Sequence, residues 1–191
     1  MALQVWLPLN GDLKNKGCAD VTVTNNGATV DNNGKIGKCY SFNNNALYGD
    51  VSNLSASEQL SGSCWVYLTD LNTSQYFFHF GGVGQWQSKF ALSYQNNHVY
   101  VCINGKEYYP TTSLTVNTWT HLATTWDGTT VKLYINGEES LSTSTSGTFA
   151  ASNHFAVGAR TNSSDGHSFA YPLINNSKLN DVRIYDHCLS A

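Results

Sequence analysis

The chain has 191 residues, of which 41% are hydrophobic and only 12% are charged, and its formal net charge is −3. The 10 lysine and arginine residues are spread out without a basic run, so nucleic acid is not an expected partner. No apolar segment reaches the roughly 18 residues that would cross a bilayer, and the N-terminus lacks the basic start and apolar stretch of a signal peptide. We therefore expect one domain over residues 1–191, with no membrane partner and no secretion signal in this chain.

Short apolar or alternating runs follow one another along the chain, separated by turn segments rich in Asn and Gly. They cover residues 3–9, 20–25, 37–42, 63–70, 76–81, 89–94, 98–103, 120–126, 131–135, 154–159 and 179–186. Many short strands between turn signals are typical of an antiparallel β-sandwich or barrel. Residues 54–60 alone resemble a helical turn.

The tripeptide Ile-Asn-Gly occurs twice, in VYVCINGKE at 99–107 and in VKLYINGEE at 131–139. Asn-Gly tolerates the positive φ angles of a two-residue type I′ turn, so each copy predicts an antiparallel hairpin. A phosphate-binding loop would need further glycines, a following helix and usually a lysine, and neither copy has them. We interpret the pair as consecutive hairpins of the sheet framework.

Five cysteines, at positions 18, 39, 64, 102 and 188, form no C-x-x-C pair, and their odd number leaves at least one thiol unpaired. Cys64 and Cys102 fall inside apolar strand patterns, where cysteine behaves as a small hydrophobic residue. We therefore expect reduced structural thiols and assembly in a reducing compartment.

The line WTHLATTWDGTTVKLYINGEE, at 119–139, resembles the signature of laminin-G-like domains in the concanavalin A-like lectin/glucanase superfamily. The closing LNDVRIYDHCLSA resembles the last core strand of the same family. This resemblance implies a jelly roll of two curved antiparallel sheets. The opening VWLPLNGDLKNKG is similar to such domains on phage or prophage tail and virion proteins, which implies a virion or extracellular particle surface and several copies on a parent particle.

Catalytic signatures are absent from the sequence. Glucanases of the superfamily use a Glu-x-Asp-x-x-Glu strand, which this chain lacks, and the adjacent Glu138 and Glu139 point to opposite faces of a strand. There is no Gly-x-Ser-x-Gly elbow and no zinc spacing among the histidines. We predict that the protein is not an enzyme, and keep glycoside hydrolysis as the least favoured alternative.

Calcium is the one cofactor that the resemblance allows, because related domains often hold it with aspartates and carbonyl oxygens. Where relatives place Asp, this chain has Asn43, Asn44 and Asn45. Asp181 matches a family aspartate, but a role as hydrogen-bond acceptor at a strand end explains it without metal. We assign no metal ligand and expect no obligatory cofactor.

Sugar recognition needs flat aromatic faces and a few amide or carboxylate groups. Trp86 lies in the glycine-rich segment GGVGQWQSK, and the segment after the 154–159 run contributes the other candidates. The candidate ligand-binding residues are Trp86, Asn162, Asp165, His167 and Tyr171. The alternative is that Trp86 folds over a sheet edge and that the polar residues are ordinary solvated loop positions.

We hypothesise a non-catalytic binding module that recognises a glycan or other cell-surface ligand, for adhesion by a phage tail or other surface protein. The alternative is a structural or decorating domain that makes protein contacts. A concave site with converging aromatic and polar groups would favour the first, and a broad flat patch the second.

Overall fold

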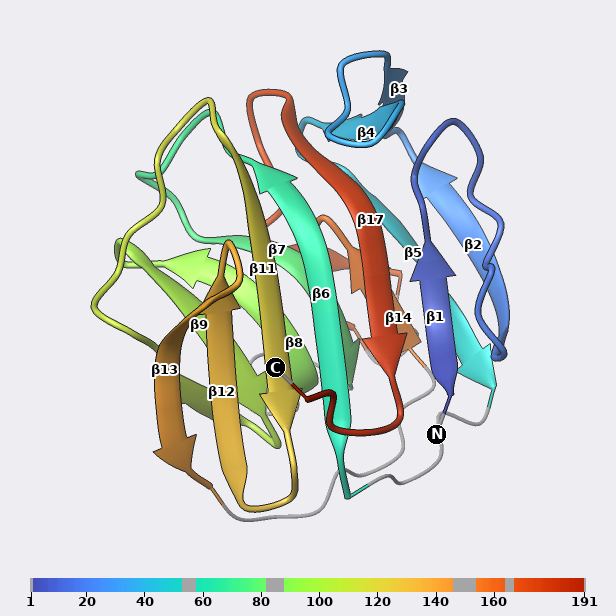
Figure 1. Cartoon of the computed structure of the whole chain (residues 1–191). Coiled ribbons are helices and arrows are strands. Elements are labelled where there is room, and N and C mark those ends of the chain that lie inside the picture. The colour runs from blue at the N-terminus through green and yellow to red at the C-terminus, as the bar shows by residue number, and fades with distance from the viewer. Residues whose placement is uncertain (1, 53–57, 82–87, 146–153, 164–166, 191) are drawn as a thin grey trace.

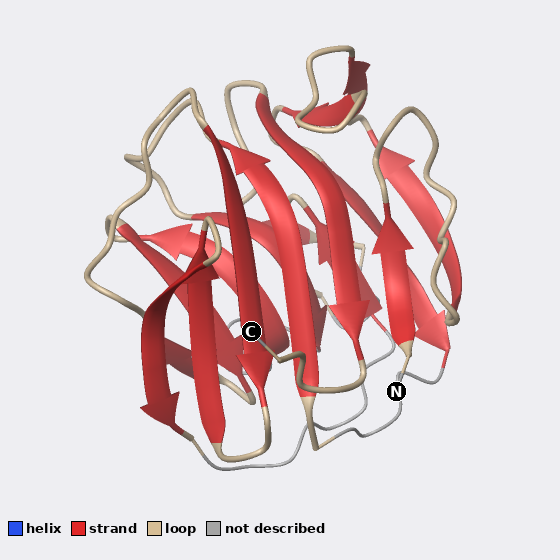
Figure 2. Ribbon diagram, in the orientation of Figure 1, coloured by secondary structure: helices blue, strands red, loops and turns tan. Residues whose placement is uncertain are grey.

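The computed structural model describes residues 2–52, 58–81, 88–145, 154–163 and 167–190. Every regular element among them is a β-strand (Figure 2), which confirms the predicted all-β class. This described part therefore contains no helix that is long and apolar enough to span a membrane. The helical turn expected at 54–60 falls mostly outside the described residues.

Two large antiparallel sheets form a sandwich (Figure 1). Sheet A has eight strands, in the order β13 (Glu138–Ser144), β12 (Thr130–Ile135), β11 (Trp119–Trp126), β6 (Leu60–Tyr67), β17 (Ser177–Tyr185), β4 (Cys39–Phe42) and β3 (Thr29–Asp31), with β1 (Leu3–Leu7) also paired to β17. Sheet B has seven, in the order β10 (Lys106–Tyr108), β9 (His98–Ile103), β8 (Ser88–Gln95), β7 (Gln75–Gly81), β14 (His154–Val157), β5 (Ala46–Ser52) and β2 (Asp20–Asn26). A small hairpin joins β15 (Arg160–Thr161) to β16 (Phe169–Ala170). The predicted two-sheet jelly roll is thus the observed architecture.

The core lies between the two sheets, because alternate side chains of each strand point inward. On β6, Cys64 and Val66 are buried, while the intervening Trp65 is partly exposed on the outer side. A Cβ atom at Gly62 would lie 2.8 Å from the Phe90 ring of β8, so the sheets are in direct contact there. Each fully buried aromatic or aliphatic side chain stabilises the sandwich by about 1.5–3 kcal/mol.

The two Asn-Gly turns are confirmed as hairpin turns, and they lie in different sheets. Asn104 and Gly105 have φ angles of 48° and 74° between β9 and β10, and Asn136 and Gly137 have 53° and 87° between β12 and β13. Positive φ at both positions defines the type I′ turn. β10 and β13 are the edge strands of their sheets, and a hydrogen bond between the Tyr108 hydroxyl and Thr145 Oγ1 links these edges.

None of the five cysteines, all of which lie in the described part of the chain, is joined in a disulfide. Cys39, Cys64 and Cys102 are buried within strands, as the apolar pattern indicated for the last two. Burial raises the pKa of the Cys39 thiol to about 11 and raises that of Cys64 further. These thiols therefore remain protonated near neutral pH and act as packing groups.

The sequence pattern did not predict strand β5, although this strand pairs with both β14 and β2 inside sheet B. Its segment ALYGDVS breaks the apolar alternation at Gly49. A Cβ atom there would lie 2.0 Å from the Thr22 carbonyl oxygen of β2 and 3.1 Å from the Phe155 ring of β14. Glycine thus lets two neighbouring strands approach closely, which is a recognised use of glycine within a strand.

Candidate functional site

The outward face of sheet B carries the candidate site, because the β15–β16 hairpin lies on it. Gly158 has a φ of 83° and ends β14, and this left-handed conformation turns the chain back across the sheet. Because Gly158 has no side chain, it also leaves room for the Phe42 ring, which would lie 2.5 Å from a Cβ atom placed on residue 158. The hairpin then contacts β7 through Thr161 and β5 through Phe169, whose ring centroid is 5.2 Å from that of Tyr48.

One part of this site is a pocket beside the ring of Tyr48, on β5. It has a volume of about 320 Å³. The residues that line it are Asp20, Thr22, Thr24, Tyr48, Gly49, Asp50 and His167. The imidazole of His167 meets the Tyr48 ring edge-on, with 5.1 Å between the ring centroids. The pocket thus combines an aromatic ring with two carboxylates and two hydroxyl groups, which is the chemistry that fixes sugar hydroxyls.

Asp50 is held in place by a neighbouring histidine. Its Oδ1 lies 2.6 Å from His154 Nδ1, at the start of β14, while 69% of the Asp50 side chain stays exposed. One carboxylate oxygen of Asp50 is therefore fixed by the protein, and the exposed remainder can accept hydrogen bonds from a ligand.

The other part of the site surrounds Arg160, at the start of the hairpin. Its guanidinium carbon lies 4.8 Å from the centroid of Tyr171 and 5.6 Å from that of Tyr76, within the range of cation–π attraction. The two tyrosine rings are themselves stacked, with 6.2 Å between centroids. Burial raises the pKa of Tyr76 to about 12, so its hydroxyl stays protonated.

His79 lies under the hairpin and is fully buried. Its Nδ1 is 3.0 Å from Thr161 Oγ1. Burial, and next the positive charge of Arg160, lower the pKa of His79 to about 3. His79 is therefore neutral near pH 7 and leaves Arg160 as the charged group of this cluster.

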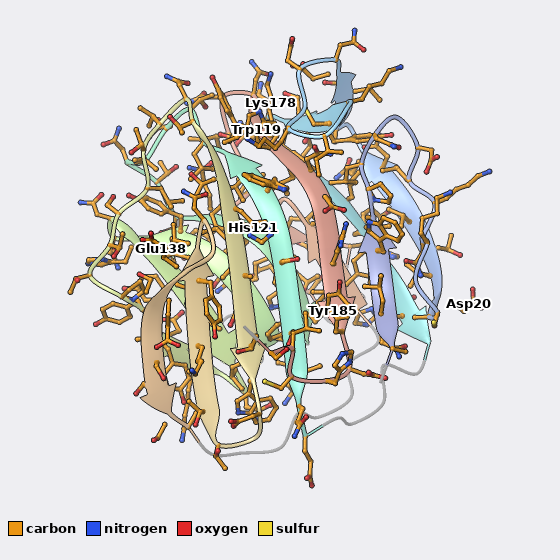
Figure 3. The ribbon with its side chains drawn as sticks, viewed as in Figure 1. Asp20, Trp119, His121, Glu138, Lys178 and Tyr185 are labelled. Atoms are coloured by element: carbon orange, nitrogen blue, oxygen red, sulfur yellow. The ribbon has the colours of Figure 1, made fainter. Side chains whose placement is uncertain are left out.

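The outward face of sheet A also presents aromatic rings, several of which are covered by cations. Lys35 Nζ lies 4.7 Å above the Trp65 ring, Lys178 Nζ lies 5.5 Å from the Tyr67 ring, and Arg183 lies over Trp6. Figure 3 shows Trp119, His121 and Lys178 on this face, over β11, β6 and β17. Because side chains of the protein itself cover these rings, the outward face of sheet B is the stronger candidate for a ligand site.

A second hollow, of about 530 Å³, lies beside the β12–β13 turn and is lined in part by Glu138 and Glu139. None of the described residues that line it is aromatic. Glu139 Oε2 already pairs with Lys132 Nζ at 2.8 Å. This hollow therefore has less of the chemistry for sugar binding than the Tyr48 pocket.

Of the five residues predicted from sequence, one lies in each part of the candidate site. His167 lines the Tyr48 pocket, and Tyr171, 44% exposed, covers Arg160. Asn162 is exposed in the hairpin, where its backbone N–H donates to the Ser168 carbonyl at 2.7 Å, and the structure gives its side chain no place in either part. Trp86 and Asp165 lie outside the described residues.

Sequence reasoning missed Tyr48, Asp20, Asp50 and Arg160. The first three come from β2 and β5, which are adjacent only in the folded sheet. The alternation of DVTVTN could have indicated that Asp20, Thr22 and Thr24 share one face, but no local pattern connects that face to Tyr48.

The sequence allowed two roles for Asp181, as a metal ligand or as a hydrogen-bond acceptor. In the structure its carboxylate accepts hydrogen bonds. Trp6 Nε1 and Arg183 Nε donate to its Oδ1 at 2.8 Å and 3.0 Å. Asn43 Oδ1 accepts from the Asn175 amide at 3.3 Å. Within the part of the chain that the structure describes, no three His, Cys, Asp or Glu side chains are grouped as metal ligands would be.

Two facing antiparallel sheets with this strand order define a sandwich of the concanavalin A-like type. The family model for the concanavalin A-like lectin/glucanases superfamily, in its laminin-G form, matches residues 41–191. Since this match spans well over half of the chain, the protein belongs to that family. A comparison with curated proteins finds no match.

Solved structures share the fold. Domain 4 of AbnA, a GH43 extracellular arabinanase from Geobacillus stearothermophilus solved in complex with arabinotriose, is 24% identical with a TM-score of 0.72, over 99% of this chain and 95% of that one. Botulinum neurotoxin type C, whose cell entry depends on interaction with two ganglioside molecules, is 14% identical with a TM-score of 0.68, over 100% of this chain and 48% of that one. A mutant Trypanosoma rangeli sialidase displaying trans-sialidase activity is 15% identical with a TM-score of 0.66, over 98% of this chain and 31% of that one. At these identities the likeness establishes the fold.

Proposed function

We propose that the protein is a non-catalytic module that binds a glycan on the outward face of sheet B. The observation that carries this proposal is the Tyr48 pocket, where an aromatic ring, two carboxylates and the imidazole of His167 converge. Sugar C–H surfaces pack on aromatic rings, and carboxylates accept hydrogen bonds from pairs of hydroxyl groups. The relatives solved with arabinotriose or dependent on gangliosides support a carbohydrate ligand for this sandwich.

The setting of the module is also part of the proposal. The resemblance of VWLPLNGDLKNKG to phage tail and virion domains supports residues 1–191 acting as one adhesion module on a virion or other extracellular particle. Weak binding at each copy would then be strengthened by several copies on one particle. Calcium is tested as a condition of the binding assay, and no residue is assigned as a calcium ligand.

Two alternatives remain distinct in their chemistry. A decorating domain would use the aromatic face of sheet A for protein contacts and would show no sugar binding. A glycoside hydrolase would use the carboxyl groups of Asp20 and Asp50, which the fold brings to one pocket. The exposure of Asp50 argues against this role, because a general acid for glycoside cleavage is normally shielded from water.

The test is an array of bacterial cell-wall and host glycans, probed with the whole chain in the presence and absence of calcium. We expect selective binding by the native protein and its loss in Tyr48→Ala and His167→Ala, while the sheet A variant Trp119→Ala binds as the native protein does. Binding that survives both sheet B changes would move the site elsewhere. Release of reducing sugar from a bound glycan would instead support hydrolysis.

A further inference from the structure

Arg160 is a buried cation whose side chain is incompletely satisfied. Only 6% of the residue is exposed, and its Nε and Nη1 atoms are buried without a hydrogen-bond partner. Among the described residues, no carboxylate lies within the 4.0 Å of an ion pair with it. A guanidinium offers five N–H donors and stays charged at any physiological pH, so burying it this way is costly.

The groups around Arg160 do not neutralise it. Tyr171 and Tyr76 supply ring faces that attract the cation, and the Tyr76 hydroxyl also hydrogen-bonds with the Arg160 side chain, but neither group carries a negative charge and Nε and Nη1 have no hydrogen-bond partner. His79 is neutral, and its Nδ1 faces Thr161. Glu107 also acts on the Tyr76 hydroxyl electrostatically, yet its own Oε1 is buried without a hydrogen-bond partner.

The ring that covers Arg160 is the exposed one. Tyr171 is 44% exposed and has a left-handed backbone, with a φ of 50°, that few residues other than glycine adopt. Such conformations cost free energy and are found disproportionately at ligand sites. Exposed side chains change rotamer within nanoseconds, so the Tyr171 ring can turn aside and open the guanidinium to a ligand.

We propose that Arg160 receives the carboxylate of an acidic sugar, with the Tyr171 ring as its movable cover; this inference rests on the proposed glycan-binding function. A carboxylate would accept a hydrogen bond from Nε or from Nη1, which lie on different edges of the guanidinium, and would balance the buried charge. The same hairpin joins this position to the Tyr48 pocket, where Asp20 and Asp50 repel anions and accept from hydroxyls. The bound glycan is therefore oriented, with neutral hydroxyls at the Asp end and its acidic residue at Arg160.

The test compares acidic and neutral probes by calorimetric titration of the whole chain. The probes are trigalacturonic acid and its neutral methyl ester, and sialyllactose and lactose, so that uronic and sialic acids are distinguished. We expect one acidic probe to bind at least about tenfold more tightly than its neutral counterpart, with a preference that weakens at high salt. Arg160→Met should abolish this preference by weakening the binding of the acidic probe to about the level of its neutral counterpart.

The melting temperature separates this role from a purely structural one. If Arg160 awaits an anion, Arg160→Met removes an uncompensated buried charge, and the melting temperature stays the same or rises. A marked fall would indicate that the tyrosine stack needs the cation for folding and would overturn the proposal. The conservative variant Arg160→Lys should retain part of the acidic preference, because it keeps the charge.

The remaining outcomes separate the two proposals. Equal binding of acidic and neutral probes by the native chain would refute the role of Arg160 and leave glycan binding intact. An acidic preference that survives in Arg160→Met would do the same. Failure of a folded native chain to bind any sugar, in the array and in the titrations, would overturn both.

Discussion

At the scale of single residues, His79 makes the stability of the fold depend on pH. It is fully buried, and burial lowers its pKa to about 3, whereas an unfolded histidine titrates near pH 6.5. Between these two values the unfolded chain binds a proton that the folded chain does not. The contribution of neutral His79 is therefore fully present above about pH 6.5 and is lost progressively as the pH falls toward 3.

We expect the free energy of unfolding to fall by up to about 1.4 kcal/mol per pH unit below pH 6.5 because of His79 alone. Substitution His79→Gln removes the titrating group and should flatten this dependence. Urea denaturation of the native and variant chains across this range measures the slope.

A matched control is His121→Gln. Burial against Trp65 lowers the pKa of His121 too. Because His121 is only half-buried, its substitution should flatten the pH dependence of the unfolding free energy less than His79→Gln does. If the native and His79→Gln chains lose stability in parallel on acidification, His79 is not the buried neutral group described above.

At the scale of secondary-structure elements, the two Asn-Gly hairpins have the same turn but different side-chain bonding. Asn136 Oδ1 accepts a hydrogen bond from the His121 amide at 2.9 Å. Asn104 Oδ1 and Nδ2 are buried without a hydrogen-bond partner. The side chain of Asn136 therefore ties its turn to β11, whereas Asn104 is linked to β8 through its backbone N–H, and its side chain adds no hydrogen bond.

We expect Asn136→Gly to lower the free energy of unfolding by about 0.5–1.5 kcal/mol more than Asn104→Gly does. Glycine suits both φ angles and adds the same flexibility to the unfolded chain in each variant, so that term cancels in the comparison. Equilibrium unfolding in urea gives the difference. Equal stabilities would mean that the Asn136 bond contributes nothing net.

The sequence was informative about elements wherever local chemistry determines structure. Alternating runs predicted long strands such as β6, β8 and β11, and Asn-Gly predicted both hairpins. β5 could not be predicted because Gly49 is explained by the approach of β2 and β14, which is a tertiary contact. The β15–β16 hairpin has only two residues in each strand, too few for any periodicity to appear.

At the scale of the whole molecule, the sandwich extends beyond the residues that the family model matches. Strands β1 and β2 precede residue 41, yet they pair with β17 and β5, one in each sheet. Val5, Leu7 and Leu9 of this N-terminal part are at most 1% exposed in the core.

A fragment limited to residues 41–191 should therefore fail to fold. Losing these three buried side chains alone removes about 5–9 kcal/mol of stabilisation, which is comparable to the total stability of a typical domain. Circular dichroism during heating and amide dispersion in proton NMR would show this. A cooperative melting transition in the fragment near that of the full chain would contradict it.

The fold class could be predicted from the sequence because it depends on patterns repeated along the whole chain. The candidate site could be predicted only in part, since His167 and Tyr171 lie four residues apart in the sequence whereas their partners come from distant strands. Tyr48 lies in a segment where no strand was predicted, and Arg160 gave no signal because its importance comes from what surrounds it. Residue types alone do not show which side chains a sheet brings together.

The antiparallel pairing of β1 with β17 has a mechanical consequence. The Ala2 amide donates to Asp186 at 2.6 Å, so the outer ends of the two strands meet at one side of sheet A, away from the outward face of sheet B. Tension applied between these two ends would first pull residues 187–189 from Ser61, and would then unzip the β1–β17 ladder from its end. Its hydrogen bonds would break one after another instead of sharing the load, so under tension the module would yield at β1 while the outward face of sheet B is still intact.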